Sequence, residues 1–186
     1  MSEEPLVYQA LLSLEKGRSL PEGTRERELA EVALRGWWHA LFDPCPTLIK
    51  EVCPPDGADV FPRFLKWADQ AHPSMKWSLH LHLFSWLLAD EKYGPAITDT
   101  MLAEAMAAAA SRWAIFDRSS SGGIVLACQR LPDRVIAGWK CQSASKGRTV
   151  NMLKVSGELK LGDMWGFFEV QGTSLKAFEP WQKIPW

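Results

Sequence analysis

A run rich in small residues lies near the middle of the chain, TDTMLAEAMAAAASR at positions 98–112. This run restricts the folds that the chain can adopt. Alanine favours helix propagation, and Thr98 or Asp99 can cap the N-terminus of a helix that begins there. The run therefore predicts a helix whose small side chains let a neighbouring element pack closely against it.

The sequence changes character from Trp113 onward. Short runs rich in Val, Ile, Phe and Trp alternate there with Gly, Asp, Ser and Pro: WAIF, GGIVLACQ, DRVIAGWKCQ, RTVNMLKV, ELKL, MWGFFEVQ and SLKAF. This pattern predicts five or six antiparallel strands. They form either a small barrel or a sheet packed on the alanine-rich helix.

Helical periodicity dominates the N-terminal half. Apolar spacing predicts helices over residues 6–16, from an N-cap at Thr24 to about Phe42, and over residues 60–71. Five prolines between residues 43 and 62 predict an ordered connecting loop instead of a long regular element.

The two halves also differ in charge. Residues 1–111 carry 10 Lys and Arg against 16 Asp and Glu, whereas residues 112–186 carry 11 against 6. The sequence thus predicts an α+β protein in which an acidic, mainly helical half (1–112) packs on a basic, Trp-containing β half (113–186) to form one compact unit.

The segment MKWSLHLHLF at residues 75–84 allows two interpretations. Its strict alternation of apolar and polar residues is typical of a half-buried strand. A helix is favoured because no β-branched residue occurs between Pro73 and Pro95. In a strand His80 and His82 would share one face and could bind a metal together, whereas in a helix they lie about 200° apart.

Four cysteines, at positions 45, 53, 128 and 141, have the spacings C-x7-C and C-x12-C. Neither spacing includes the C-x2-C pair typical of zinc sites, so buried free thiols are predicted. No metal or other cofactor is expected. A mixed site remains the alternative, in which His39 or His72 joins Cys45 and Cys53. The weak candidate ligands are thus Cys45 and Cys53, together with the pair His80 and His82.

Motifs for catalysis are absent: the sequence contains neither G-x-S-x-G nor H-E-x-x-H. Acid-base chemistry would have to use His80 or His82 with Asp90 or Glu91, and nucleophilic chemistry would have to use a cysteine. The protein is therefore predicted not to be an enzyme.

The basic half contains a stretch that suits phosphate-bearing ligands, WKCQSASKGRTVNMLK. Its cations neutralise phosphates, and nearby tryptophans, Trp139 or Trp165, could stack on bases. The alternative is a solvated hairpin loop whose charge protects an edge strand from aggregation. The predicted contacts to phosphate are Lys140, Lys146, Arg148 and Lys154.

The loop DRSSSGG at residues 117–123 also has two interpretations. Its arginine, hydroxyls and flexible glycines could form a backbone nest for an anion, or the glycines could simply assist a turn into the strand IVLACQ. The first interpretation assigns anion binding to Arg118, Ser119, Ser120, Ser121, Gly122 and Gly123.

Asp117, Ser119 and Gly122 match the D-x-S-x-x-G element of the PilZ domain, so this short stretch resembles that family. The resemblance implies a β-barrel that binds cyclic di-GMP. The R-x-x-x-R signature of the family is missing, because Arg112 is the only nearby arginine that precedes Arg118.

These observations predict a non-catalytic protein that binds an anionic partner as a subunit of a larger assembly. Nucleic acid is favoured over a nucleotide as that partner. The alternative is a protein-interaction or structural subunit, or a homo-oligomer, in which Trp181 and Trp186 of EPWQKIPW contact the partner. No uncharged apolar run is long enough to span a bilayer, and acidic residues near Met1 are unlike a signal peptide, so a cytoplasmic protein without membrane contact is expected.

Overall fold

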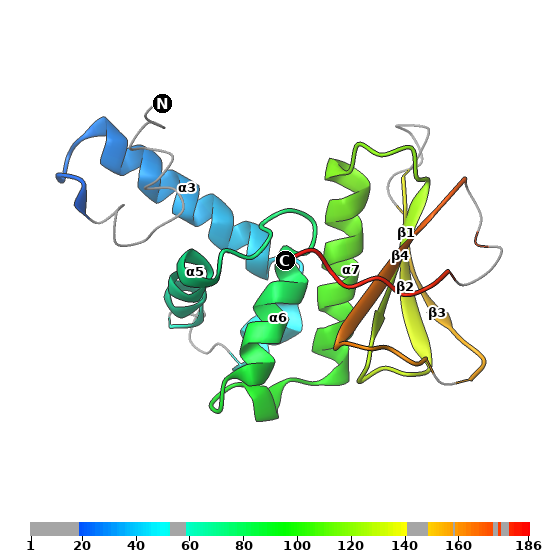
Figure 1. The fold of residues 1–186 in the computed structure, drawn as a ribbon. Helices are drawn as coiled ribbons and strands as arrows, with labels where there is room; N and C mark the ends of the chain where they lie inside the picture. The colour runs from blue at the N-terminus through cyan, green and yellow to red at the C-terminus, as the bar shows by residue number, and fades with distance from the viewer. Residues whose placement is uncertain (1–18, 53–58, 141–148, 158, 173–174, 176–178) are drawn as a thin grey trace. The chain divides into compact units, whose positions relative to one another are not determined.

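The structure is a computed structural model (Figure 1). It describes residues 19–52, 59–140, 149–157, 159–172, 175 and 179–186. The contacts divide the chain into two compact units, residues 1–72 and 73–186. Residues 73–112 belong with the sheet, so the change of sequence character at Trp113 lies inside the second unit.

Three helices form the described part of the first unit: α3 (Arg25–Phe42), α4 (Pro46–Val52) and α5 (Val60–Ala71). The expected cap of α3 is confirmed, because Thr24 Oγ1 accepts a hydrogen bond from Arg27 N at 3.3 Å. Phe42 is fully buried at the end of α3, with its ring 6.1 Å from that of Phe61 in α5. The predicted helix over residues 6–16 lies outside the described residues.

The second unit begins with two α-helices, α6 (Leu79–Ala89) and α7 (Asp99–Phe116), joined through the 3-10 turn η1 (Gly94–Ala96). The helical interpretation of residues 79–84 is therefore confirmed, and the strand alternative is wrong. All residues from Leu79 to Phe84 are buried, which shows that the N-terminal part of α6 is enclosed on every side. The polar positions of the alternating segment are therefore buried together with the apolar ones.

The alanine-rich helix α7 is capped as predicted, with Thr98 Oγ1 accepting from Met101 N at 3.4 Å. It is longer than expected, because WAIF at residues 113–116 continues the helix instead of forming a strand. The strand prediction is wrong there since Trp113 is fully buried on the helix, and the backbone leaves the helix only at Asp117. Tertiary burial outweighed the strand propensity of these residues.

Four antiparallel strands form one sheet in the order β3-β2-β1-β4. Their bounds are β1 (Gly123–Cys128), β2 (Arg134–Trp139), β3 (Thr149–Lys154) and β4 (Trp165–Val170). The α+β class is confirmed. The barrel alternative is wrong because β3 and β4, the two outer strands, do not pair with each other.

The expected fifth and sixth strands do not appear among the described residues. Leu159 and Leu161 of ELKL pack on the core as irregular backbone, and SLKAF lies mostly outside the described residues. No described helix is both long enough and apolar enough to cross a membrane.

Each face of the sheet is covered. Helix α7 packs on β1 and β2, and a Cβ atom added to Gly138 would lie 2.9 Å from Ala110 Cβ. The small residues of α7 therefore allow close packing, as predicted. The opposite face forms an apolar cluster around Val125, Val135 and Phe168, which Trp181 and other partly buried side chains cover.

The segment 179–186 passes around the β4 edge of the sheet and has contacts on both sides of it. Trp181 packs on Phe168, with ring centroids 5.0 Å apart, and Gln182 pairs with Phe167 of β4. Beyond that bridge the chain runs toward α6 (Figure 1). The carbonyl oxygen of Pro185 lies 2.9 Å from His82 Nε2 in that helix. This segment thus occupies part of the outer edge of β4.

Candidate functional site

The loop that follows α7 forms a hydrogen-bonded cluster around Asp117. Its carboxylate oxygen Oδ2 accepts from the backbone N–H of Ser119 at 2.9 Å, from the Ser119 hydroxyl at 2.5 Å and from Lys140 Nζ at 2.5 Å. Lys140 Nζ also donates to Ser119 O at 2.8 Å and lies 4.6 Å from the centroid of the Trp113 ring. Asp117 and Lys140 therefore form a half-buried ion pair.

This cluster changes the acidity of Asp117. Burial alone would raise its pKa, but the hydrogen bonds from Lys140 and Ser119 and the positive charge of Lys140 outweigh burial and lower the pKa below its usual value. Asp117 is accordingly ionised at neutral pH.

The second half of the loop uses another carboxylate. The Ser121 hydroxyl donates to Glu169 Oε2 at 2.5 Å and accepts from Gln171 Nε2 at 3.0 Å. Gly122 lies so close to the backbone that a Cβ atom would be 1.7 Å from Gly172 O, and a Cβ atom on Gly123 would meet the Trp139 ring. The glycines thus allow close packing where the turn enters β1.

Ser119 and Ser121 therefore donate to carboxylates of the protein itself. Arg118 and Ser120 are exposed. Anion binding by this loop stays a prediction.

Two of the four predicted phosphate contacts belong to the described residues, whereas Lys146 and Arg148 lie outside them. Lys140 is held by Asp117, and Lys154 is exposed at the end of β3. Lys140 follows Trp139, which pairs with Thr149, whereas Lys154 pairs with Arg134, so these two cations lie at opposite ends of the β2 and β3 pair. Phosphate binding by the four cations stays a prediction.

The tryptophans singled out from the sequence occupy different environments. Trp165 is only 3% exposed, and its indole N–H donates to Ser85 Oγ at 2.8 Å, which leaves no free ring face for stacking. Trp139 and Trp181 are half-buried against the apolar cluster. Trp186 is 68% exposed and contacts the His82 ring edge to face.

The candidate metal ligands belong to different parts of the chain. His80 and His82 are buried in α6 of the second unit, Cys45 is buried in the first unit, and Cys53 lies outside the described residues. Within the described ranges, no three His, Cys, Asp or Glu side chains are placed to share a metal ion.

The sheet has an uncovered edge at β3, which pairs with β2 alone among the described residues. Val155 N donates to Asp133 O just beyond the strand, which fixes the alternation of hydrogen-bonded pairs along β2 and β3. By that alternation Val150, Met152 and Lys154 direct their backbone N–H and C=O groups away from β2. Within the described ranges, the edge therefore has hydrogen-bonding groups that no other strand uses.

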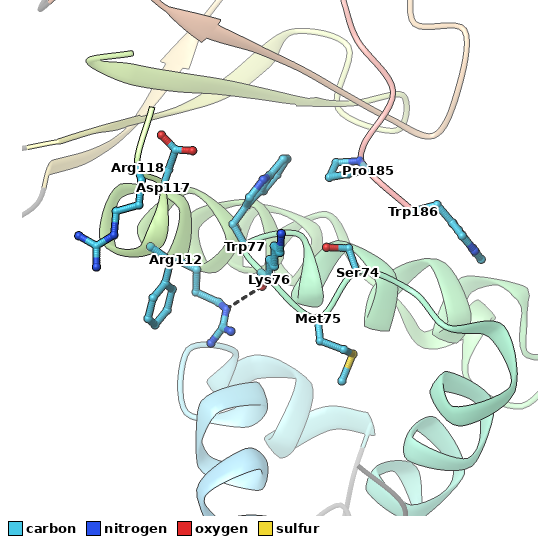
Figure 2. Close-up of a pocket in the computed structure, with 10 residues that line it drawn as sticks. Ser74, Met75, Lys76, Trp77, Arg112, Asp117, Arg118, Pro185 and Trp186 are labelled. Atoms are coloured by element: carbon cyan, nitrogen blue, oxygen red, sulfur yellow. Dashed lines mark hydrogen bonds between the residues drawn. The ribbon is translucent and has the colours of Figure 1, made fainter. Parts of the chain in front are cut away.

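A cavity of about 790 Å³ lies in the second unit, on the α6 and α7 side. Figure 2 shows Arg112 and Arg118 at one end of its lining, Pro185 and Trp186 at the other, and Lys76 and Trp77 between them. These residues come from three separate segments. Sequence reasoning identified Arg118 and Trp186 but missed the others, because no motif connects them and the sequence shows only that Lys76 and Arg112 carry a charge.

Comparison with known proteins gives one match. A family model described as "Methanobactin biosynthesis cassette protein MbnC-like" matches residues 18–185. No curated protein matches the chain. The family description overturns the prediction of nucleic-acid binding, since it assigns the family to a biosynthesis, and it gives no support to the resemblance to PilZ.

Proposed function

The chain belongs to the MbnC-like family of methanobactin biosynthesis cassette proteins, and from this membership we propose that it is a non-catalytic accessory protein that binds a protein partner in that biosynthesis. The open edge of β3 is the observation that carries the proposal. The partner contributes an extended segment that adds a strand to the sheet.

Burial of the reactive side chains supports a non-catalytic role. The Cys128 thiol is fully buried, and this burial raises its pKa to about 11, which keeps it protonated and poorly nucleophilic at neutral pH. His80, His82 and Cys45 are likewise buried. Groups this far from solvent cannot reach a substrate without local opening of the fold.

The geometry of β3 supports strand addition. Three residues on this edge, Val150, Met152 and Lys154, present backbone N–H and C=O groups in the spacing that an added strand requires. Met152 and Leu153 are 52% and 36% exposed and lie on opposite faces of the strand. A partner strand would thus gain main-chain hydrogen bonds together with one apolar contact on each face.

The opposite edge of the sheet is less available. Gln182 already exchanges two backbone hydrogen bonds with Phe167 of β4, at 3.0 and 2.8 Å. Strand addition is therefore expected at β3 and not at β4.

The proposal is tested with the full chain and each of the other proteins of the cassette, purified separately and measured by isothermal titration calorimetry. Met152→Pro removes an outward N–H without removing a hydrogen bond to β2. We expect this variant to lose roughly tenfold or more in affinity for the partner.

The matched control is Met152→Thr, which keeps the N–H and removes only the large apolar side chain. It should bind more tightly than Met152→Pro. Equal binding by the wild type and both variants would exclude strand addition at β3. Failure of every cassette protein to bind would exclude the accessory role itself.

A second copy of this chain is the competing partner for this edge. If β3 pairs with β3 of a second copy, light scattering will show a dimer that Met152→Pro dissociates, and no cassette protein will be needed. A cytoplasmic location stays a prediction, and it is consistent with Cys45 and Cys128 being buried outside any disulfide bond.

A further inference from the structure

The cavity described above has an excess of positive charge. Lys76, Arg112 and Arg118 line it together with one carboxylate, that of Asp117. Asp117 is engaged with Lys140, which lies outside the lining. Within the part of the chain that the structure describes, none of the three lining cations forms an ion pair with a carboxylate.

Arg112 is the best oriented of these cations. Its Nε donates to the backbone carbonyl oxygen of Lys76 at 3.2 Å (Figure 2). Its guanidinium lies 5.3 Å from the centroid of the Phe116 ring. These two contacts fix the guanidinium and leave its terminal nitrogens for a further acceptor. A planar fork held in this way suits the two oxygens of a carboxylate.

Partial burial makes a counter-charge favourable at this position. Loss of solvation lowers the pKa of Arg112 below its usual value, although the side chain remains charged at neutral pH. A desolvated cation without an anionic partner is unfavourable, so a ligand carboxylate would gain both charge attraction and hydrogen bonds.

The rest of the lining is aromatic. Trp77 is half-buried with its ring 5.1 Å from that of Phe167, whereas Phe116 and Trp186 are 54% and 68% exposed. Exposed rings of this size beside cations are typical of a binding surface for a ligand that is both acidic and apolar.

We propose that this cavity binds an acidic peptide segment of a protein partner, in which a Glu or Asp carboxylate pairs with Arg112 and an adjacent apolar side chain packs against Trp77 and Trp186. Lys76 and Arg118 accommodate a second carboxylate or steer the segment toward the cavity. The inference shares with the proposed function only the premise that the ligand belongs to a protein. The cavity is separate from the β3 edge, because no residue of β3 lines it.

The probe is the peptide Gly-Glu-Phe-Glu-Gly, acetylated and amidated so that its only carboxylates are side chains, titrated into the full chain by isothermal titration calorimetry. The matched peptide Gly-Gln-Phe-Gln-Gly has the same shape without the charge. We expect saturable binding of the acidic peptide. The affinity for the neutral peptide should be lower by roughly tenfold or more. Equal binding of the two peptides, or no saturable binding of the acidic one, overturns the proposal.

Variants locate the peptide. Arg112→Gln should weaken binding by roughly tenfold or more, and Arg118→Gln by a smaller factor. Lys183→Gln is the matched control, because Lys183 is a cation of the same unit with an 82% exposed side chain that does not line the cavity. An equal loss with Lys183→Gln would mean non-specific charge attraction and would contradict the proposal.

Two further measurements keep the test decisive. If Arg112→Gln unfolds the protein, the double variant Lys76→Gln, Arg118→Gln replaces it, since neither side chain is buried or forms an ion pair with the residues that the structure describes. Binding of 3-phenylpropionate as tightly as the peptide would identify a small-molecule carboxylate site and overturn the peptide assignment.

Met152→Pro should leave peptide binding unchanged. A failure of the strand-addition proposal at β3 can therefore be distinguished from a failure of the peptide proposal at the cavity.

Discussion

His82 Nε2 lies 2.9 Å from the carbonyl oxygen of Pro185, 103 residues further along the chain. Because a carbonyl can only accept, Nε2 carries the proton, and the buried ring of α6 holds the segment 179–186 in place. The same carbonyl accepts from the Ser78 hydroxyl at 3.5 Å, and the His82 ring also contacts Trp186. The position of one wall of the cavity therefore depends on this histidine.

Replacing His82 tests that anchor. His82→Ala should lower the free energy of unfolding by about 1–3 kcal/mol, because it removes the hydrogen bond to Pro185 and leaves a cavity. His82→Gln retains a donor and should cost less. Urea denaturation measures both, with His39→Ala as control, since the His39 side chain is 55% exposed. Equal stability of His82→Ala and wild type would show that the anchor contributes nothing.

The pH dependence of stability follows from the same residue. Burial lowers the pKa of His82 below its usual 6.5, and the hydrogen bond to Pro185 O opposes this only in part. The unfolded chain therefore binds a proton more readily than the folded one. The stabilisation is complete above pH 6.5 and is lost as the pH falls from 6.5 toward the folded pKa, with a slope of at most about 1.4 kcal/mol per pH unit.

Denaturation in urea between pH 5 and 7.5 measures this slope. The non-titrating variant His82→Gln should flatten it. A slope that is the same in the wild type and in His82→Gln would assign the pH dependence to other groups.

The contact between α7 and the sheet predicts opposite effects of alanine at two glycines. In Gly138→Ala the new Cβ would lie 2.9 Å from Ala110 Cβ and 3.0 Å from Ala110 O, so helix and strand must separate, at a cost of about 1–3 kcal/mol. In Gly36→Ala nothing lies within 4 Å on the exposed face of α3, and alanine should stabilise that helix by about 0.5–1 kcal/mol. Thermal unfolding of the two variants compares them, and a neutral Gly138→Ala would contradict the close packing.

Two serines of the loop after α7, Ser120 and Ser121, should differ sharply in their contribution to the free energy of unfolding. Ser121→Ala removes the donor to Glu169 and the acceptor for Gln171 at a buried position, so we expect a loss of about 1–3 kcal/mol in unfolding free energy. Ser120→Ala changes an exposed side chain and should stay within about 0.5 kcal/mol of the wild type. Equal effects of both substitutions in chemical denaturation would show that the Ser121 network is not a stabilising one.

Local features of the sequence predicted local features of the structure. Thr24 and Thr98 were predicted as caps because a cap depends on backbone N–H groups within three residues of the side chain. The helix over residues 79–84 was favoured for a similar reason, the absence of β-branched residues. WAIF was assigned to a strand because its composition is β-like, whereas the burial of Trp113 that keeps it helical depends on distant residues.

The sequence by itself determined the α+β class, the capped helices and the small-residue helix that packs on the sheet, since propensity, capping and periodicity act within a few turns. Only the tertiary structure decided which polar groups meet. Ser121 reaches Glu169 across 48 residues, and Arg112 reaches the backbone of Lys76 across 36. The open edge at β3 and the cationic cavity are likewise products of strand order and of the path of residues 179–186. Such pairings depend on long-range packing, which no motif in one chain encodes.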